Sequence, residues 1–309
     1  MDEGLYQHDV IGSIVTYKSN PAELERAIRS FVNTALRVKI LVVDNSPTET
    51  LGPMCRRLGT EYLYTGKNYG FGAGHNIAFR ATSTAKYHLA LNADVQFESG
   101  TLEQLVDFLE LNESVGLVMP RVLYPDGSPQ KLCKKLPGPF DMLARRAFPR
   151  ILRRLYHRRM ALFELSNVDT NVVLSVPHLS GCFMLMRKKA LLECGVFDER
   201  FFLYFEDVDL TRRIHERYQT VYYPHVKITH RHDKGSYKSP RLLFYGIRSA
   251  VRYFNKWGWV WDDKRDLANN VIGPLVNISL PDSIQTLKHQ RSVPPPEPAF
   301  ESTASRGKL

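Results

Sequence analysis

The chain has 309 residues, a mass of 35.5 kDa and a formal net charge of +10, from 42 lysines and arginines against 32 aspartates and glutamates. Its 43% hydrophobic and 24% charged residues are typical of a soluble globular protein, which argues against wholesale disorder and against an integral membrane protein. Ten basic residues and one acid fall within 131–160, and one such patch does not suit a protein that follows a phosphate backbone, so we expect no nucleic-acid partner.

The first half of the chain alternates strand and helix patterns. Short apolar runs predict buried strands, and helical spacing of apolar residues predicts helices between them. The predicted strands are 10–16, 38–44, 61–64 and 87–91, and the predicted helices are 21–33, 74–82 and 101–112. This alternation indicates an α/β fold with a mostly parallel central sheet and helices on both faces.

The second half is less regular. It predicts strands at 179–186 and 221–228, helices after Lys188 and over 207–217, and a C-terminal helical segment that begins at Pro240. Four parts are therefore expected: an α/β domain over 1–236, a basic amphipathic insertion in it at about 131–163, an amphipathic helical region over 237–280, and a disordered tail over 281–309.

The cysteines and the first residues indicate a cellular compartment. The four cysteines are widely spaced and form no C-x-x-C pair, which favours neither a zinc site nor a disulfide framework. The first ten residues carry acids where a secretory signal would carry basic residues, and no apolar core follows. We expect a cytoplasmic protein.

Polar residues follow several of the predicted strands, where ligands bind in an open parallel sheet. They are Thr16 and Tyr17, Asp44 and Asn45, Asn92 to Asp94, and the stretch 205–209. Each of these taken alone is also explained by capping or turn formation. The glycine-rich run 66–76 precedes a helix and suits a phosphate contact, but a simple glycine turn fits it as well.

Carboxylates and histidines supply two further candidate groups. Asp94 could hold a divalent cation together with a diphosphate, and the acids of YFEDVDL lie among aromatic residues, which suits a general base. A helix N-terminus rich in acids is the alternative for that motif. The histidines at 225, 230 and 232 match no zinc pattern, although one of them could complete a metal site.

Taken together, the motifs resemble the inverting family-two glycosyltransferases, in particular the rhamnosyltransferase-like branch that builds bacterial surface polysaccharides. The resemblance covers about residues 10–256. Its motifs are, in chain order, SIVTYKSN, ILVVDNS, NYGFGAGHNIAF, LALNADV, LYPDGS, SGCFMLMRKKALLECGVFDERFFLYFEDVDLTRR and the run from Pro224 to Ser236. It implies a GT-A fold, a nucleotide-diphosphate-sugar donor and a divalent cation, Mg²⁺ or Mn²⁺.

The resemblance also assigns roles to residues of this chain. Asp207, preceded by Glu206, would be the catalytic base, and Asp94 with His230 would hold the metal. Asn92 stands where the wider family has the first acid of its D-x-D motif. The donor would contact Thr16, Tyr17, Asp44, Asn68, Gly70, Asn76, Asn92 and Asp94, and the acceptor or sugar side would contact Gly181 and Cys182.

The implied activity is a metal-assisted single displacement that inverts the anomeric carbon, with L-rhamnose from dTDP-rhamnose as the first choice of donor. The acceptor would be a hydroxyl of a glycan or lipid-linked glycan in lipopolysaccharide or related polysaccharide synthesis. Two alternatives stay open. A sugar nucleotidyltransferase would need a basic phosphate loop after the first strand, where the chain has TYKSN, and a non-catalytic membrane-binding module would not depend on Asp94 or Asp207.

Two amphipathic segments predict peripheral contact with an anionic membrane. In 139–163 an apolar row runs beside a row of arginines, with Pro149 expected to divide the helix. In 241–256 an arginine face opposes an apolar face that includes Ile247, Val251 and Phe254, and three tryptophans follow. A solvated helix packed on the domain is the alternative for the first segment. The expected location is the inner face of the plasma membrane.

Overall fold

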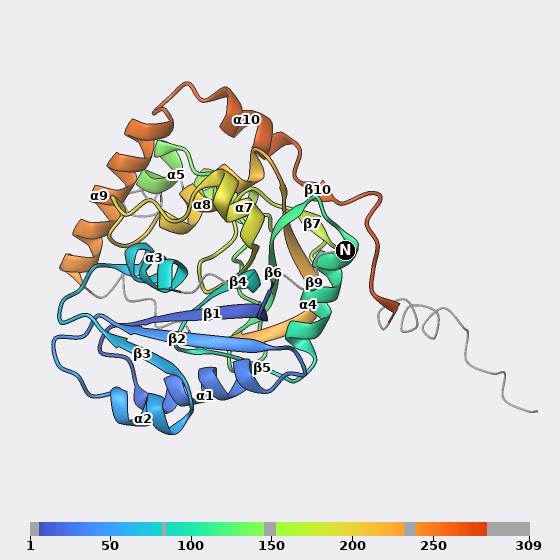
Figure 1. Cartoon of the computed structure of the whole chain (residues 1–309). Coiled ribbons are helices and arrows are strands. Elements are labelled where there is room, and N and C mark those ends of the chain that lie inside the picture. The colour runs from blue at the N-terminus through green and yellow to red at the C-terminus, as the bar shows by residue number, and fades with distance from the viewer. Residues whose placement is uncertain (1–5, 82–84, 145–152, 232–238, 283–309) are drawn as a thin grey trace, which may run out of the picture.

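The structure is a computed structural model that describes residues 6–81, 85–144, 153–231 and 239–282 (Figure 1). Up to residue 123 the elements are β1 (His8–Thr16), α1 (Pro21–Val32), β2 (Val38–Asp44), α2 (Gly52–Arg57), β3 (Glu61–Tyr64), α3 (Phe71–Ala81), β4 (Ala85–Leu91), β5 (Val95–Phe97), α4 (Thr101–Leu111) and β6 (Val115–Leu123). After it they are α5 (Pro139–Ala144), α6 (Arg153–Phe163), β7 (Leu174–Ser175), β8 (Phe183–Arg187), α7 (Lys188–Cys194), α8 (Glu206–His215), β9 (Gln219–His230), α9 (Pro240–Trp257), α10 (Asp263–Asn270) and β10 (Gly273–Pro274).

One sheet organises the chain, in the order β10-β7-β9-β6-β8-β4-β1-β2-β3, with β5 paired to β9. Among the described strands of four or more residues, β8 alone runs against the others; the remaining antiparallel pairs involve strands of two or three residues. The predicted α/β class with a mostly parallel central sheet is therefore confirmed. The parallel pairing of β1 with β2 and β4 brings their carboxyl ends to one edge.

Helices cover both faces of this sheet. Figure 1 shows α1 and α2 on one side of β1, β2 and β3, and α3 on the other. The helix α1 begins at Pro21, its N-cap Asn20 accepts a hydrogen bond from the Ala22 N–H, and its buried side chains lie at the spacing that the sequence predicts. These side chains are Leu24, Ala27, Ile28 and Phe31, which join the main hydrophobic core with the sheet residues.

Several described elements differ from the sequence prediction, β6 and β9 among them. Strand β6 was not predicted, and its run contains Pro120, which lacks an N–H for a sheet ladder. The pairing of β6 with β9 shifts register between Pro120 and Arg121, so an irregularity accommodates the proline. Strand β9 extends to His230, two residues beyond the predicted 221–228, and this places the histidine inside the sheet.

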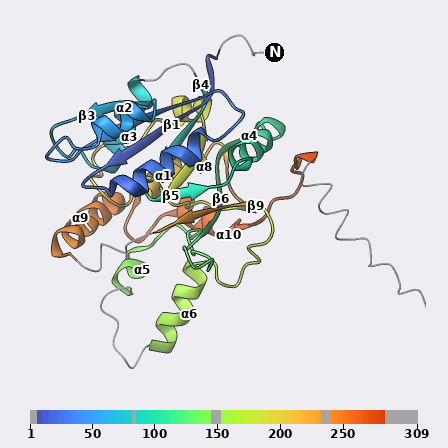
Figure 2. The ribbon, with the colours of Figure 1, turned by 90° about the horizontal axis from the view of Figure 1, so that it is seen from below.

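The basic segment 139–163 is described as two helices, α5 and α6, and residues 145–152, which include Pro149, are not described. Figure 2 shows α6 pointing away from the sheet. Of the predicted tail, only 281 and 282 belong to the described part of the chain. No helix among the described residues combines the length and the apolar character needed to cross a bilayer.

Candidate active site

A pocket of about 450 Å³ lies at the carboxyl ends of β1 and β2. The loop before α3, the loop that precedes α8 and the first turns of α9 complete its walls. Four of the predicted donor residues line it: Thr16, Tyr17, Asn68 and Gly70. A ligand at this edge would occupy the position expected for an open parallel sheet.

Asp44 lies buried beneath this pocket rather than on its wall. Its carboxylate accepts hydrogen bonds from the Thr16 hydroxyl at 3.1 Å, the Ser46 N–H at 2.9 Å and the Tyr62 hydroxyl at 2.7 Å. Burial, and then the hydrogen bond to this carboxylate, raise the pKa of Tyr62 well above its ordinary value. Asp44 therefore fixes the ends of β1 and β2 against each other, and it supports the residues that face the pocket.

Gly70 shapes the pocket through its backbone. Its φ of +90° lies in the left-handed region that favours glycine, and its C=O accepts a hydrogen bond from the Asn45 side chain at 3.1 Å. The Asn68 side chain accepts a hydrogen bond from the Gly70 N–H at 2.8 Å, and the Phe71 N–H donates to the Phe202 C=O at 3.1 Å. The loop before α3 is thus held to the loop before α8.

Two residues of the glycine-rich run 66–76 have different structural roles. Gly74 lies inside α3, where a Cβ would come within 2.7 Å of the Val15 side chain, so this glycine lets the helix pack closely on β1. Asn76 is buried and does not line the pocket. Its side chain donates to the Phe197 C=O at 2.8 Å and to Glu199 at 2.9 Å. Asn76 therefore fastens α3 to the loop after α7.

Asp94 and His230 meet at the junction of β4, β5 and β9. Asp94 Oδ1 lies 3.4 Å from His230 Nε2, and the Asn92 side-chain amide lies 3.3 Å from the same nitrogen. His230 Nδ1 is 3.1 Å from Gln130 Oε1, and the Gln130 amide donates to the His230 C=O at 2.6 Å. Burial disfavours the charged imidazole, but Asp94 and Cys182 outweigh it and raise the pKa of His230 to about 10.

This arrangement fits one divalent cation with few protein ligands. The bond to Gln130 engages Nδ1 and turns Nε2 toward Asp94, as in sites where an outer residue orients a ligating histidine. A carboxylate such as that of Asp94 suits Mn²⁺ or Mg²⁺, and His230 Nε2 would add one nitrogen ligand. Among the described residues no three His, Cys, Asp or Glu side chains gather at one point, so donor phosphates and water would supply the other ligands. His232 lies outside the described residues.

Asp207 stands in the first turn of α8, half-buried. Its Oδ2 accepts a hydrogen bond from the Gly181 N–H at 2.9 Å, and its Oδ1 accepts one from the Val208 N–H at 2.9 Å. Glu206, next to it, is buried, and its Oε2 has no hydrogen-bond partner among the described residues. Burial and the charge of Asp207 raise the pKa of Glu206 well above its ordinary value. Of the two carboxyl groups, Asp207 is the more accessible one.

Residues 180–182 link Asp207 to the segment that contains Asn92 and Asp94. The Asn92 N–H donates to the C=O of Cys182 at 3.0 Å, while the neighbouring Gly181 N–H binds Asp207. A Cβ at Gly181 would lie 3.3 Å from the Cβ of Asp207, tighter than ordinary packing, so glycine permits this approach. Cys182 itself is buried. One short segment therefore sets the position of Asp207 relative to Asn92 and its neighbours.

The residues before α8 adopt a backbone that the sequence did not reveal. Tyr204 and Phe205 have φ values of +68° and +69°, in the left-handed region that non-glycine residues rarely adopt. Two such residues in succession store strain, of the kind that gathers at functional sites. They turn the chain so that α8 begins with Glu206 and Asp207 beside Gly181.

Sequence reasoning missed three contributors to the site. Tyr245 and Arg241 from α9 form the outer wall of the pocket, and Gln130, which orients His230, is 100 residues away in the chain. No local pattern signals such partners. This glutamine follows the LYPDGS motif, which is part of the family resemblance but had no role assigned to it.

The family model described as glycosyl transferase family 2 matches residues 13–195. Among curated proteins, the chain is 27% identical over 242 residues to N-acetylglucosaminyl-diphospho-decaprenol L-rhamnosyltransferase of Mycobacterium tuberculosis, covering 73% of this chain and 77% of that protein. It is 25% identical over 234 residues to rhamnosyltransferase WbbL of Escherichia coli, covering 70% and 81%. A low-salt glycan biosynthesis hexosyltransferase of Haloferax volcanii is 24% identical over 204 residues, covering 65% and 59%.

Two solved structures share the fold. One is GalNAc-T7 with UDP, GalNAc and Mn²⁺, with a TM-score of 0.60, 16% identity and coverage of 86% of this chain. The other is TarS of S. aureus, with a TM-score of 0.52, 15% identity and coverage of 84%. The chain spans 51% and 42% of those two longer chains.

Proposed function

Because the chain belongs to glycosyl transferase family 2 and is a glycosyltransferase with the GT-A fold, we propose that it moves L-rhamnose from dTDP-rhamnose to a hydroxyl of a lipid-linked glycan. The reaction is a single displacement that inverts the anomeric carbon. The rhamnose and the lipid-linked acceptor rest on the names of the relatives, two of which are rhamnosyltransferases and one of which acts on a diphospho-decaprenol. The product enters the synthesis of a surface polysaccharide.

The observation that carries this proposal is the placement of Asp207. Its carboxylate is held by two backbone N–H groups, one of them from Gly181. The loop before α8 also forms a wall of the pocket at β1 and β2 through Phe202 and Leu203. A donor in that pocket would therefore have its reactive end beside a fixed carboxylate, as proton removal in a displacement requires.

The chain's own residues divide the work of the reaction. Asp207 takes the proton from the acceptor hydroxyl as the oxygen attacks the anomeric carbon, and the bond from that carbon to the donor diphosphate breaks. Thr16, Tyr17, Asn68 and Gly70 hold the nucleoside end of the donor. Asp94 and His230 would hold a divalent cation, which when bound stabilises the charge of the leaving diphosphate.

We place the acceptor at a membrane surface. Three apolar side chains of α9 lie exposed on one face, Phe244, Ile247 and Val251, with the exposed Arg248 among them. An apolar stripe with arginine beside it suits the interface of an anionic bilayer. Phe254, which the sequence assigned to this face, is buried instead, and Trp257 packs inward by donating to Asp209 at 2.8 Å. The exposed aromatic anchors are Trp259 and Trp261.

In this proposal residues 1–236 carry the transfer chemistry and 237–280 bring it to the membrane. The two parts also share the donor pocket, because Arg241 and Tyr245 of α9 line it. The basic segment at about 131–163 adds to the positive charge of the same molecule.

The decisive test is the Asp207→Asn variant. The amide keeps the shape of the side chain and cannot take a proton, so we expect turnover to fall by about 10²–10⁴-fold while the donor still binds. Turnover would be measured with a lipid-linked acceptor, and donor binding by thermal stabilisation in a screen of nucleotide sugars with and without Mn²⁺. Near-normal turnover would show that Asp207 is not the base. If a nucleotide sugar other than dTDP-rhamnose stabilises the protein, that sugar would be assigned as the donor instead.

A further inference from the structure

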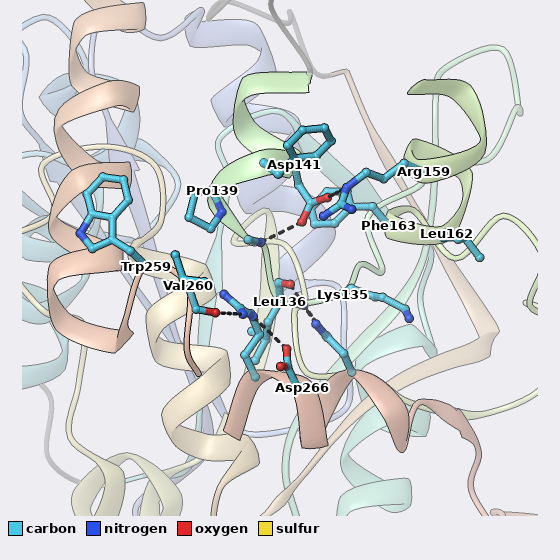
Figure 3. A pocket seen from close by; sticks show the side chains of 14 residues that line it. Lys135, Leu136, Pro139, Asp141, Arg159, Leu162, Phe163, Trp259, Val260 and Asp266 are labelled. Carbon is cyan, nitrogen blue, oxygen red and sulfur yellow. Dashed lines mark hydrogen bonds and ion pairs between the residues drawn. The ribbon is translucent and has the colours of Figure 1, made fainter. Parts of the chain in front are cut away.

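A second cavity lies apart from the donor pocket and has no assigned role. Its volume is about 470 Å³, and it shares no lining residue with the pocket at β1 and β2. Figure 3 shows it between the α5–α6 region and the segment that runs from the end of α9 into α10. Parts of the chain more than 90 residues apart, such as Arg159 and Arg265, therefore form opposite walls.

The wall supplied by α10 holds a buried cation with an unused donor. Arg265 is only 9% exposed. Its Nη2 donates to the Val260 C=O at 3.0 Å and its Nε to Asp266 at 3.2 Å, whereas its Nη1 is buried with no hydrogen-bond partner among the described residues. A buried guanidinium N–H without an acceptor is costly, so an anion in the cavity would satisfy it.

The charges around the cavity favour an anion further. Lys135 and Arg159 line it together with Arg265, against two carboxylates, Asp141 and Asp266. Asp141 is already occupied, because it accepts hydrogen bonds from the Gly138 N–H at 2.8 Å and from Arg159 Nε at 2.7 Å. Asp266 lies largely in solvent, where its charge is screened. The Arg159–Asp141 pair is thus balanced, and the remaining charged side chains of the lining, Lys135 and Arg265 against Asp266, leave a net positive charge.

Apart from Asn269, whose side chain is hydrogen-bonded to the Leu136 backbone, the remaining side chains of the lining are apolar, and several are exposed to water. Phe140, Leu162 and Val260 are 46%, 47% and 66% exposed and stand at the rim, while Leu136 is buried at the floor. The Arg159 guanidinium lies 4.6 Å over the Phe140 ring, so charge and apolar surface alternate across a short distance. A free phosphate would leave this rim bare, whereas an anionic amphiphile would cover it.

The cavity adjoins the catalytic side of the molecule. Its floor residue Leu136 packs with Phe205 and Val208, which flank the Glu206–Asp207 pair. The Lys134 N–H donates to the His178 C=O at 3.2 Å, three residues before the Gly181 that binds Asp207. The floor of the cavity thus packs in one apolar cluster with residues on either side of Asp207.

We infer that this cavity binds the phosphate end of the lipid-linked acceptor, an inference that rests on the proposed function. The phosphate pairs with Arg265 and Lys135, and the first units of the prenyl chain lie against Phe140, Leu162 and Val260. The sugar attached to the phosphate then extends toward Asp207.

Binding of a short prenyl phosphate tests the ligand class. Isothermal titration calorimetry of the full chain would compare farnesyl phosphate with farnesol, which lacks the anion, and with inorganic phosphate, which lacks the chain. Because a hydrogen-bonded ion pair contributes about ten- to a hundredfold in affinity, we expect farnesyl phosphate to bind at least about tenfold more tightly than either. Equal binding of farnesol, or equal binding of inorganic phosphate, would overturn the assignment.

Variants locate the ligand. Arg265→Gln removes Nη1 and the charge, and Val260→Asp places a negative charge at the rim without disturbing a buried residue. Each should weaken farnesyl phosphate binding at least about tenfold. Leu267→Asp is the matched control, since Leu267 is 67% exposed on α10, does not line the cavity, and should change binding less than about twofold. Wild-type affinity in Val260→Asp would overturn the assignment even if Arg265→Gln failed to fold.

Donor binding separates this inference from the proposed function. Stabilisation by dTDP-rhamnose with Mn²⁺ should be unchanged in Val260→Asp, because Val260 lines the second cavity and does not line the donor pocket. If the donor binds and farnesyl phosphate does not, the proposed function survives and the cavity assignment fails. If no nucleotide sugar binds, the proposed function itself fails.

Discussion

At the scale of single residues, neighbouring carboxyl groups have opposite environments. Glu206 is buried, and within the described part of the chain its Oε2 has no hydrogen-bond partner, while Asp207 accepts two backbone hydrogen bonds. Burial, followed by the charge of Asp207, raises the pKa of Glu206 far above its ordinary 4.5. Burial therefore favours the neutral form of the Glu206 carboxyl.

Glu206→Gln should change how stability depends on pH. A raised folded-state pKa means that the stability contributed by neutral Glu206 is complete below pH 4.5 and is lost as pH rises toward the folded value. Glutamine stays neutral throughout. We therefore expect the melting temperature of the variant, relative to that of the wild type, to rise between pH 5 and pH 8. Thermal unfolding across this range checks it, and a gap that does not change with pH would contradict it.

Gln130 should control metal affinity without touching the metal. It is held between the ring and the C=O of His230, so Gln130→Ala frees the imidazole to rotate. Loss of such an outer partner typically costs about 10–100-fold in metal affinity. Titration with Mn²⁺ would measure the loss, and Gln96→Ala on β5 is the control, because Gln96 is two residues from Asp94 and pairs across the sheet with Thr229 rather than with His230. Equal affinities of the two variants would argue against Gln130 as an orienting residue.

At the scale of elements, α8 depends on α10. Arg212 of α8 and Asp262, the N-cap of α10, form a buried double hydrogen bond at 2.6 and 2.7 Å. The Arg212 guanidinium also lies 4.0 Å over the Trp257 ring. The helix that carries Asp207 is therefore fastened to the C-terminal region and not to the sheet alone.

Asp262→Ala should destabilise the whole fold. It leaves the Arg212 charge buried without its partner and removes the cap of α10, and breaking a buried pair typically costs about 3–5 kcal/mol. Urea unfolding would measure the cost. The exposed pair Lys264–Glu216, at 3.1 Å, offers the control, since Lys264→Ala should cost less than about 1 kcal/mol. Similar costs for both variants would show that α10 does not support α8.

The sequence predicted those elements whose evidence is local. The alternation through 10–112, the strand-end positions of Thr16 and Asp94, and the motif containing Asp207 could all be found from spacing and resemblance. What could not be found depends on distant partners or on backbone shape. Strand β6, whose run contains Pro120, was not predicted. The left-handed turn at 204–205 contains no glycine, which is the usual sequence signal for that backbone conformation.

At the scale of the whole molecule, the positive charge and the exposed apolar side chains gather in the later part of the chain. The excess charge lies within 131–160, and exposed apolar residues follow on α9 and after it. Figure 1 places α9 at one edge of the molecule and α4 at the opposite edge. Helix α9, with its exposed apolar side chains, therefore lies at one edge of the molecule.

Ile247→Asp should weaken attachment to anionic vesicles. Ile247 is 55% exposed on the apolar stripe of α9, and an acid there both removes apolar contact and repels the lipid charge. Flotation with vesicles that contain phosphatidylglycerol would show the loss. Leu111→Asp is the matched control, because Leu111 is 50% exposed at the end of α4 and should leave flotation unchanged. If neither variant changes flotation, the apolar stripe of α9 is not the surface that contacts the vesicle.

The pair between Arg212 and Asp262 also bears on how the chain is made. The two residues are 50 positions apart, so a ribosome must deliver nearly the whole described chain before Arg212 has its counter-charge. The sheet made by the first residues can form earlier, because β1 to β4 pair among themselves. During synthesis the ends of β1 and β2 could therefore come together before the helix that carries Asp207 is fastened to the C-terminal region.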